Sequence, residues 1–194
     1  MDDDVLGAVL AGGTSDRMGR PKAALGIDGV TFLERAVATL DRVCGEVIVC
    51  GGDAVAPGTR VLPDVTLGAG PLGGVASALD HAGGRPVFIL AVDFPLVAVE
   101  TVRRVMGRGP MPGQARIARV DGRIQPVCGV YAGDLAPVVR GRLESGDRSL
   151  MAFLRRVPHL TLVDITDGSL RNVNTPDDYA ALVAGCDDGD AGLS

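Results

Sequence analysis

The sequence is poor in aromatic residues. Aromatic side chains make up 3% of the 194 residues and tryptophan is absent, whereas hydrophobic residues make up 46%. A core must therefore be built from Val, Leu, Ala and Ile packed against a glycine-rich backbone. The chain has 28 glycines, about twice the usual share of ~7%. Such glycine use favours tight turns and close approach to a ligand, although a glycine-tolerant, GC-biased genome would give the same count.

Three further absences exclude classes of protein. A net charge of −5 and a pI near 5.0 disfavour a nucleic-acid partner, which needs a basic face. No apolar run approaches the ~18 residues that span a bilayer, and Met1–Asp4 is acidic where a signal peptide is basic, so we expect a cytoplasmic protein without a membrane partner. No C-x-x-C spacing indicates a disulfide framework or a zinc site among Cys44, Cys50, Cys128 and Cys186.

Lysine is almost absent as well. Of the 19 basic residues, 18 are arginines, and Lys22 is the only lysine. An ammonium is a compact, strongly hydrated point charge that suits phosphate oxygens, whereas a guanidinium is a planar fork. Lys22 lies in a glycine-rich loop, so it is a candidate phosphate ligand; chance retention of a lysine is the alternative.

Apolar runs alternate with helical patterns in the first half of the chain. We expect strands at 5–10, 47–50, 60–62 and 87–92, a helix from Thr31 to about residue 43, and a second helix from the loop 68–74 to about His81. Thr31 and Glu34 have the spacing of a capping box. This alternation predicts a Rossmann-like three-layer α/β/α fold with a mostly parallel sheet, whose ligands bind beyond the carboxyl ends of the strands.

The second half has a different pattern. Segments 115–120 and 124–131 flank Asp121-Gly122, a turn signal that predicts an antiparallel hairpin. We expect helices at 134–144, 149–156 and 175–184 and a strand at 160–164. One domain at 1–185 is expected, with halves 1–107 and 108–185, followed by a disordered acidic tail at 186–194.

The loop after the first strand carries the strongest chemical signal. Leu10-Ala11-Gly12-Gly13 is followed by Arg17 and Lys22, so backbone amides and two cations gather at the end of a buried strand, which is how proteins hold a triphosphate. Ala23 stands where a Walker A loop has its Ser or Thr for magnesium, which argues against a P-loop kinase or GTPase. A surface loop with two solvated cations is the alternative.

Asp93 follows the strand 87–92 and should face the same cleft. A carboxylate in that place suits a hard cation that keeps water and substrate oxygens as its other ligands. The alternative is a helix N-cap before Pro95.

The loop segment resembles the L-A-G-G-x-S-x-R-M-G-x-x-K signature of molybdenum cofactor guanylyltransferases and related sugar-nucleotide and molybdopterin nucleotidyltransferases. Later pieces of that family follow in order: Gly70-Pro71-Leu72-x-Gly74, Asp93-Phe94-Pro95, Gln125-Pro126 and Asn172-Val173-Asn174-Thr175-Pro176-Asp177-Asp178. The resemblance covers Val5 to about Leu182. It implies a GT-A-like nucleotidyltransferase fold and Mg²⁺-dependent transfer of GMP from GTP to molybdopterin, with release of pyrophosphate. We also expect transient contacts with other proteins of cofactor biosynthesis, and a monomer or weak homo-oligomer.

The resemblance also implies roles for single residues. Asp93 binds the metal, and Lys22 and Arg17 stabilise the charge of the transferring phosphate. The nucleotide contacts are Leu10, Ala11, Gly12, Gly13, Lys22, Asp64 and Asp93, and the acceptor contacts are Gln125, Pro126, Asn172 and Asn174. Asp64 also fits an ordinary turn, and the acceptor set also fits a hairpin and a helix N-cap.

Other functions remain open. Gly68-Ala69-Gly70-Pro71-Leu72-Gly73 is a literal G-x-G-x-x-G with Asp93 twenty residues later, which is typical of NAD-binding oxidoreductases, although Pro71 removes an amide from such a loop. An inactive nucleotide-binding module would carry the same signatures. Cys50 stands where we align the family's asparagine near the nucleoside, so a cytidylyltransferase or a sugar-phosphate nucleotidyltransferase also fits.

Overall fold

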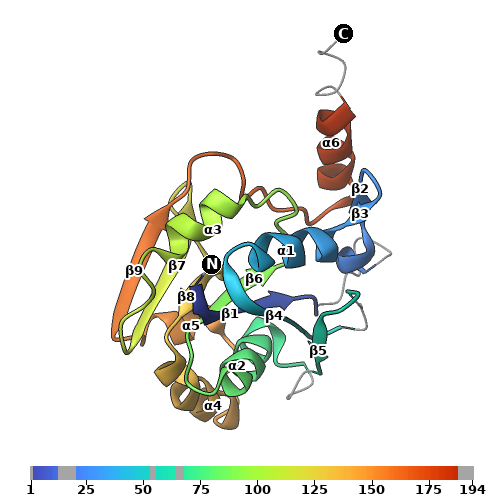
Figure 1. The fold of residues 1–194 in the computed structure, drawn as a ribbon. Coiled ribbons are helices and arrows are strands. Elements are labelled where there is room, and N and C mark those ends of the chain that lie inside the picture. The colour runs from blue at the N-terminus through green and yellow to red at the C-terminus, as the bar shows by residue number, and fades with distance from the viewer. Residues whose placement is uncertain (1, 13–20, 53–55, 64–67, 188–194) are drawn as a thin grey trace.

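A seven-stranded sheet forms the centre of the computed structural model, which describes residues 2–12, 21–52, 56–63 and 68–187 (Figure 1). The strand order is β5-β4-β1-β6-β8-β7-β9. The strands are β1 (Asp2–Leu10), β4 (Cys44–Cys50), β5 (Arg60–Leu62), β6 (Val87–Ala91), β7 (Gln114–Val120), β8 (Arg123–Tyr131) and β9 (His159–Asp164). β8 runs antiparallel to both of its neighbours, whereas the other pairings are parallel. The predicted mostly parallel sheet with an antiparallel hairpin is confirmed.

Helices cover both faces of this sheet. α1 (Phe32–Asp41) and α3 (Val99–Met106) lie on one face, and α2 (Gly70–Ala82) and α4 (Ala136–Glu144) lie on the other (Figure 1). α5 (Leu150–Leu154) packs against β8, where the rings of Phe153 and Tyr131 stack at 6.3 Å. Short 3-10 turns precede β2, at η1 (Lys22–Ala24), and connect β8 to α4, at η2 (Gly133–Leu135). The three-layer α/β/α architecture is as predicted.

Local sequence explains where the central elements form. All five residues of β6 are buried, which is expected of a strand covered on both faces. α1 begins at Thr31, whose Oγ1 accepts from the backbone N of Glu34 at 3.1 Å, while the Glu34 carboxylate accepts from the Thr31 N at 2.8 Å. The predicted capping box is confirmed. α2 ends at Gly83, whose φ of 61° is the left-handed geometry that favours glycine.

Three regions differ from the sequence prediction. Between the expected strand at 5–10 and the expected helix from Thr31, where no further element was predicted, the chain forms η1 and a small hairpin of β2 (Gly26–Ile27) and β3 (Val30–Thr31). The hairpin turns at Asp28 and Gly29, which have positive φ. α2 begins at Gly70, inside the expected glycine loop 68–74, because proline is tolerated in the first turn of a helix. α3 was not predicted, although Val102, Val105 and Met106 recur at helical spacing and are buried.

The first turn of the last described helix lies near the small hairpin. α6 (Pro176–Asp187) lies beside β2 and β3 (Figure 1), and Tyr179 Oη donates to Gly26 O at 2.7 Å. α6 extends to Asp187, and the rest of the predicted tail lies outside the described residues. Over the described ranges, every helix is too short or too polar to cross a bilayer.

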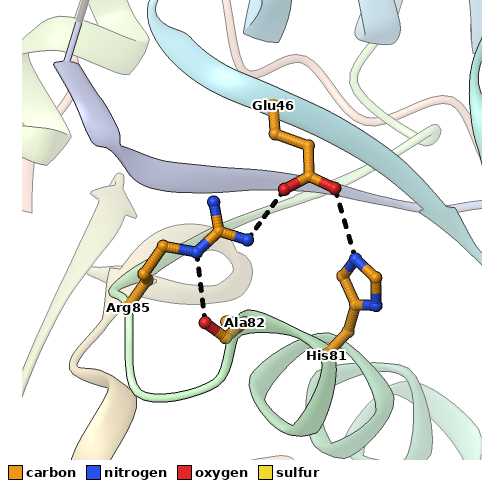
Figure 2. Close-up of polar contacts among 4 residues, drawn as sticks. All are labelled: Glu46, His81, Ala82 and Arg85. Carbon is orange, nitrogen blue, oxygen red and sulfur yellow. Dashed lines mark hydrogen bonds and ion pairs between the residues drawn. The ribbon is translucent and has the colours of Figure 1, made fainter.

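Glu46 of β4 links two segments at the amino ends of the strands (Figure 2). Its carboxylate accepts from Arg85 Nη2 at 2.7 Å and lies 3.3 Å from His81 Nε2, and Arg85 Nε also donates to Ala82 O at 3.1 Å. Hydrogen bonds from Arg85 and, to a smaller degree, His81 hold the pKa of Glu46 below its usual range. The cluster therefore ties the end of α2 and the segment before β6 to β4.

Glu46→Gln should destabilise the protein at neutral pH and have less effect in acid. A depressed carboxyl pKa adds stability that is fully present above the unfolded-state pKa, about 4.3 for glutamate, and is lost as the pH falls through the folded-state pKa. The carboxylate is partly exposed, so we expect a loss of less than ~1 kcal/mol at pH 7. Urea unfolding at neutral and acid pH measures it, with the exposed Glu144→Gln as control. An equal loss at both pH values would contradict the role of the Glu46 charge.

Candidate active site

A pocket of about 720 Å³ lies beyond the carboxyl ends of β1, β4 and β6. The residues that follow these strands form one wall, and the start of α2 and the η1 turn form another. The lining residues are Leu10, Ala11, Gly12, Pro21, Lys22, Cys50, Gly52, Gly68, Gly70, Pro71, Gly74, Ala91, Val92, Asp93 and Val127. The prediction that the loops after the first strand and after residue 92 face one cleft is confirmed.

Backbone forms much of the pocket near β1. Ala11 N donates to Cys50 O at 3.0 Å, so the turn after β1 is held against the end of β4. A Cβ on Gly52, whose φ is 74°, would lie 2.9 Å from Ala11 O, and a Cβ on Gly74 would lie 2.8 Å from Leu10 Cδ2. Side chains at these two glycines would therefore crowd the turn that carries the L-A-G-G segment.

The first turn of α2 faces the same pocket. Gly70, Pro71 and Gly74 line it, and Ala69 at the N-cap has no side-chain oxygen that could accept from the first amides of the helix. The positive end of a helix dipole together with unpaired amides stabilises a bound anion. This wall is therefore suited to phosphate oxygens.

Three segments that are distant in sequence meet at the ammonium of Lys22. Lys22 Nζ lies 3.0 Å from Asp93 Oδ1 and donates to Asn174 Oδ1 at 2.7 Å. The Lys22 side chain is 15% exposed and that of Asp93 is 30% exposed, so water screens the pair only in part. Val173 N donates to Asp93 O at 3.0 Å, which holds the segment before α6 against the end of β6.

The structure places most of the predicted nucleotide residues together. Leu10, Ala11, Gly12, Lys22 and Asp93 all line the pocket, and their roles in binding stay predictions. The remaining nucleotide and charge-stabilising candidates, Gly13, Arg17 and Asp64, lie outside the described residues.

Asp93 is not a helix N-cap. Phe94 N donates to Ala91 O at 3.4 Å in a turn, and the following helix, α3, begins at Val99 with Ala98 as its N-cap. That alternative from the sequence is wrong, because Pro95 is followed by a second turn rather than by a helix. The carboxylate therefore has no capping role that would explain it.

The predicted acceptor residues Gln125 and Pro126 lie within β8. Ile117 of β7 pairs with Gly129 but Ala118 pairs with Gln125, so residues 126–128 of β8 bulge out of the pairing with β7. Proline cannot donate to a sheet ladder, and a bulge is how an interior strand accommodates it. The bulge brings Val127 to the pocket, a residue that sequence reasoning missed although the proline signalled the bulge.

The two asparagines before α6 are both exposed. The side-chain oxygen of Asn174 accepts from Lys22 Nζ at 2.7 Å. Thr175 Oγ1 accepts from Asp178 N at 3.1 Å, and Asp178 Oδ2 accepts from Thr175 N at 2.9 Å. Helix capping therefore explains Thr175 and Asp178, whereas the helix N-cap that was the alternative for the asparagines does not explain the side chain of Asn174.

The donor set at Asp93 fits a divalent cation that is shared with a substrate. Among the described residues, no cluster of three His, Cys, Asp or Glu side chains could hold a metal ion. A hard cation at Asp93 therefore needs phosphate and water oxygens as its other ligands, which is typical of Mg²⁺ in nucleotide enzymes.

The NAD-binding interpretation is wrong on topology. A dinucleotide fold needs its glycine loop between two parallel strands that follow each other and lie side by side. Here the glycine segment lies between β5 and β6, which are separated in the sheet by β4 and β1. Moreover Gly73 is buried in the body of α2 rather than lying in a loop.

Comparison with known proteins agrees with this geometry. Residues 7–161 match the MobA-like NTP transferase domain, so the chain belongs to this family and is a nucleotidyltransferase. Its fold is that of Archaeoglobus fulgidus molybdopterin-guanine dinucleotide biosynthesis protein A, with a TM-score of 0.76 and 20% identity over 94% of this chain and 99% of that one.

Two relatives are closer in sequence. A probable molybdenum cofactor guanylyltransferase from Chloroflexus aggregans is 35% identical, over 92% of this chain and 93% of the relative. A molybdenum cofactor guanylyltransferase from Rhizobium leguminosarum bv. trifolii is 33% identical, over 91% of this chain and 90% of the relative.

Proposed function

We propose that this chain is a molybdenum cofactor guanylyltransferase, which transfers GMP from GTP to molybdopterin and releases pyrophosphate. The observation that carries the proposal is the meeting of Lys22 and Asp93, 3.0 Å apart, on a glycine-lined pocket at the carboxyl ends of parallel strands. The names of relatives 33% and 35% identical to this chain support the choice of base and acceptor.

The chemistry follows from charge. The acceptor is a phosphate monoester with a second pKa near 6, so it is a dianionic nucleophile at neutral pH. One of its oxygens attacks the α-phosphorus of GTP; the new O–P bond forms as the α–β bridging P–O bond breaks, and pyrophosphate leaves with the electron pair. No general base is needed. His81 is bound to Glu46 at the amino ends of the strands, and His159 begins the edge strand β9, which suits such a reaction.

The chain's own residues position the triphosphate and neutralise its charge. Lys22 donates to phosphate oxygens, and the start of α2 and the backbone near Gly12 approach the same group. Asp93 would hold Mg²⁺, which when bound offsets negative charge on the phosphates. Arg17, predicted to assist, lies outside the described residues.

Few described residues of the pocket could select the nucleobase. Cys50 ends β4, is 1% exposed and lines the pocket at the position aligned with an asparagine in the family. A thiol is a weak hydrogen-bond donor and acceptor compared with an amide. A cytidylyltransferase or sugar-phosphate nucleotidyltransferase of the same fold is therefore the second candidate, and base selectivity must come from other groups.

Ligand-induced thermal stabilisation tests the nucleotide. GTP, CTP, ATP, UTP, dTTP and NAD are compared with and without Mg²⁺, and GTP with Mg²⁺ should give the largest shift. Ligand at about 100 times its Kd adds roughly 2.7 kcal/mol, on the order of 5 to 10 °C for a domain of this size. Preference for another triphosphate would change the substrate and keep the reaction class, whereas a response to NAD alone would contradict the proposal.

A further inference from the structure

Asn174 approaches Lys22 from the side of the chain that was expected to bind the acceptor. Lys22 Nζ has only protons to give, so the 2.7 Å contact must be made to the amide oxygen, as observed. Asp93 Oδ1 forms an ion pair with the same ammonium at 3.0 Å. The lysine is therefore held between an anionic and a neutral acceptor.

The backbone around Asn174 is held from both sides. Val173 is fully buried and its N donates to Asp93 O at 3.0 Å. On the other side, Asn174 N donates to Asp178 Oδ2 at 2.9 Å within the cap of α6. Farther back, Thr101 Oγ1 of α3 lies 2.7 Å from Ser169 Oγ, which ties the preceding loop to the body of the protein. The amide of Asn174 is thus presented from a constrained segment.

A bound substrate should affect the contacts of Lys22 with Asp93 and with Asn174 differently. Asp93 is a carboxylate that fits a divalent cation, and a carboxylate shared with a cation attracts an ammonium less. The amide of Asn174 is neutral, so it keeps its hydrogen bond without cancelling the positive charge that a triphosphate needs. A carboxylate in place of Asn174 would accept the same bond and add an unfavourable charge near the phosphates.

We propose that Asn174 is a positioning residue for Lys22, which it holds in place for the triphosphate, and that it acts on the nucleotide side rather than as a ligand of the acceptor. This inference rests on the proposed function for the identity of the triphosphate. The contact itself is tested without any ligand.

The single lysine makes the first test direct. Growth with lysine labelled at Cε and Nζ gives one side-chain signal, because Lys22 is the only lysine in the chain. In Asn174→Ala this signal should move toward that of a solvated lysine, while Asn172→Ala, which changes an equally exposed asparagine two residues earlier, should leave it in place. An unmoved signal in Asn174→Ala would overturn the proposal.

Titration with GTP and Mg²⁺, without acceptor, provides the second test. Asn174→Ala should bind about tenfold more weakly than the wild type, the scale of a hydrogen bond to a charged group. Asn172→Ala should bind GTP as the wild type does. Asn174→Asp should retain a Lys22 signal near that of the wild type yet bind GTP more weakly, because it keeps the contact and adds charge. If Asn174→Ala fails to fold, the GTP affinity of Asn174→Asp tests the same contact.

Two results separate failure of the inference from failure of the proposed function. Unchanged GTP affinity in Asn174→Ala, with a raised KM for the acceptor, would make Asn174 an acceptor ligand and overturn the inference alone. A wild-type protein that responds to no triphosphate would overturn the proposed function, and the ligand-free lysine signal would still decide whether Asn174 holds Lys22.

Discussion

Asp93→Ala is expected to abolish nucleotidyl transfer, with a loss of at least ~10³-fold in kcat/KM, the upper range for removal of one group that stabilises transition-state charge. The side chain is 30% exposed, and the neighbouring hydrogen bonds of this turn are made by the backbone. The variant should therefore lose less than ~1 kcal/mol of stability. Pyrophosphate release measures the first effect and urea unfolding the second.

Metal binding by Asp93 can be measured separately from activity. Binding of Mn²⁺ in the presence of GTP, followed by electron paramagnetic resonance, should weaken in Asp93→Ala. Asp41→Ala, which changes an exposed carboxylate at the end of α1, should leave both activity and Mn²⁺ binding unaltered. Turnover like that of the wild type in Asp93→Ala would remove Asp93 from the mechanism.

Lys22→Ala should mainly weaken engagement of the triphosphate. Loss of a hydrogen bond between a cation and a phosphate corresponds to roughly 10- to 100-fold in affinity, so the KM for GTP should rise by that factor. Initial-rate kinetics with GTP and acceptor varied separately measure the effect. A raised KM for the acceptor alone would contradict the assignment of Lys22 to the nucleotide.

Lys22→Arg is the informative companion to that variant. The planar guanidinium keeps the charge, but its shape differs from that of an ammonium held 3.0 Å from Asp93 and 2.7 Å from Asn174. We expect this variant to be impaired, though less than Lys22→Ala. Full activity would mean that charge alone matters, and that the lone lysine among arginines was retained by chance.

Sequence reasoning succeeded where local pattern determines structure. Buried strands such as β6 and the turn at Asp121-Gly122 were recognisable from apolar runs and turn chemistry. The shared cleft of Leu10 and Asp93 followed from the rule that parallel strands end at one edge of a sheet. α3 was missed although Val102, Val105 and Met106 recur at the three- to four-residue spacing of an amphipathic helix, so the signal was present in the sequence.

Contacts between segments that are distant in sequence could not be predicted from the sequence. Lys22 and Asn174 are 152 residues apart, and their meeting depends on the backbone hydrogen bond from Val173 to Asp93. The resemblance placed Asn174 with the acceptor, and no local signal indicates which side of the pocket its amide approaches. The G-x-G-x-x-G match was misleading for a related reason: strand order decides its meaning, and strand order is not written in six residues.

The position of β8 between β6 and β7 has a consequence for how the protein folds. β7 precedes β8 in the chain but reaches the central sheet only through it, so β7 can join only with or after β8. β9 in turn pairs with β7, and the segment that carries Asn174 follows β9. The outer strands can therefore join the sheet only in the order β8, β7, β9, which differs from their order in the chain, and the contact of Asn174 with Lys22 needs the segment beyond β9.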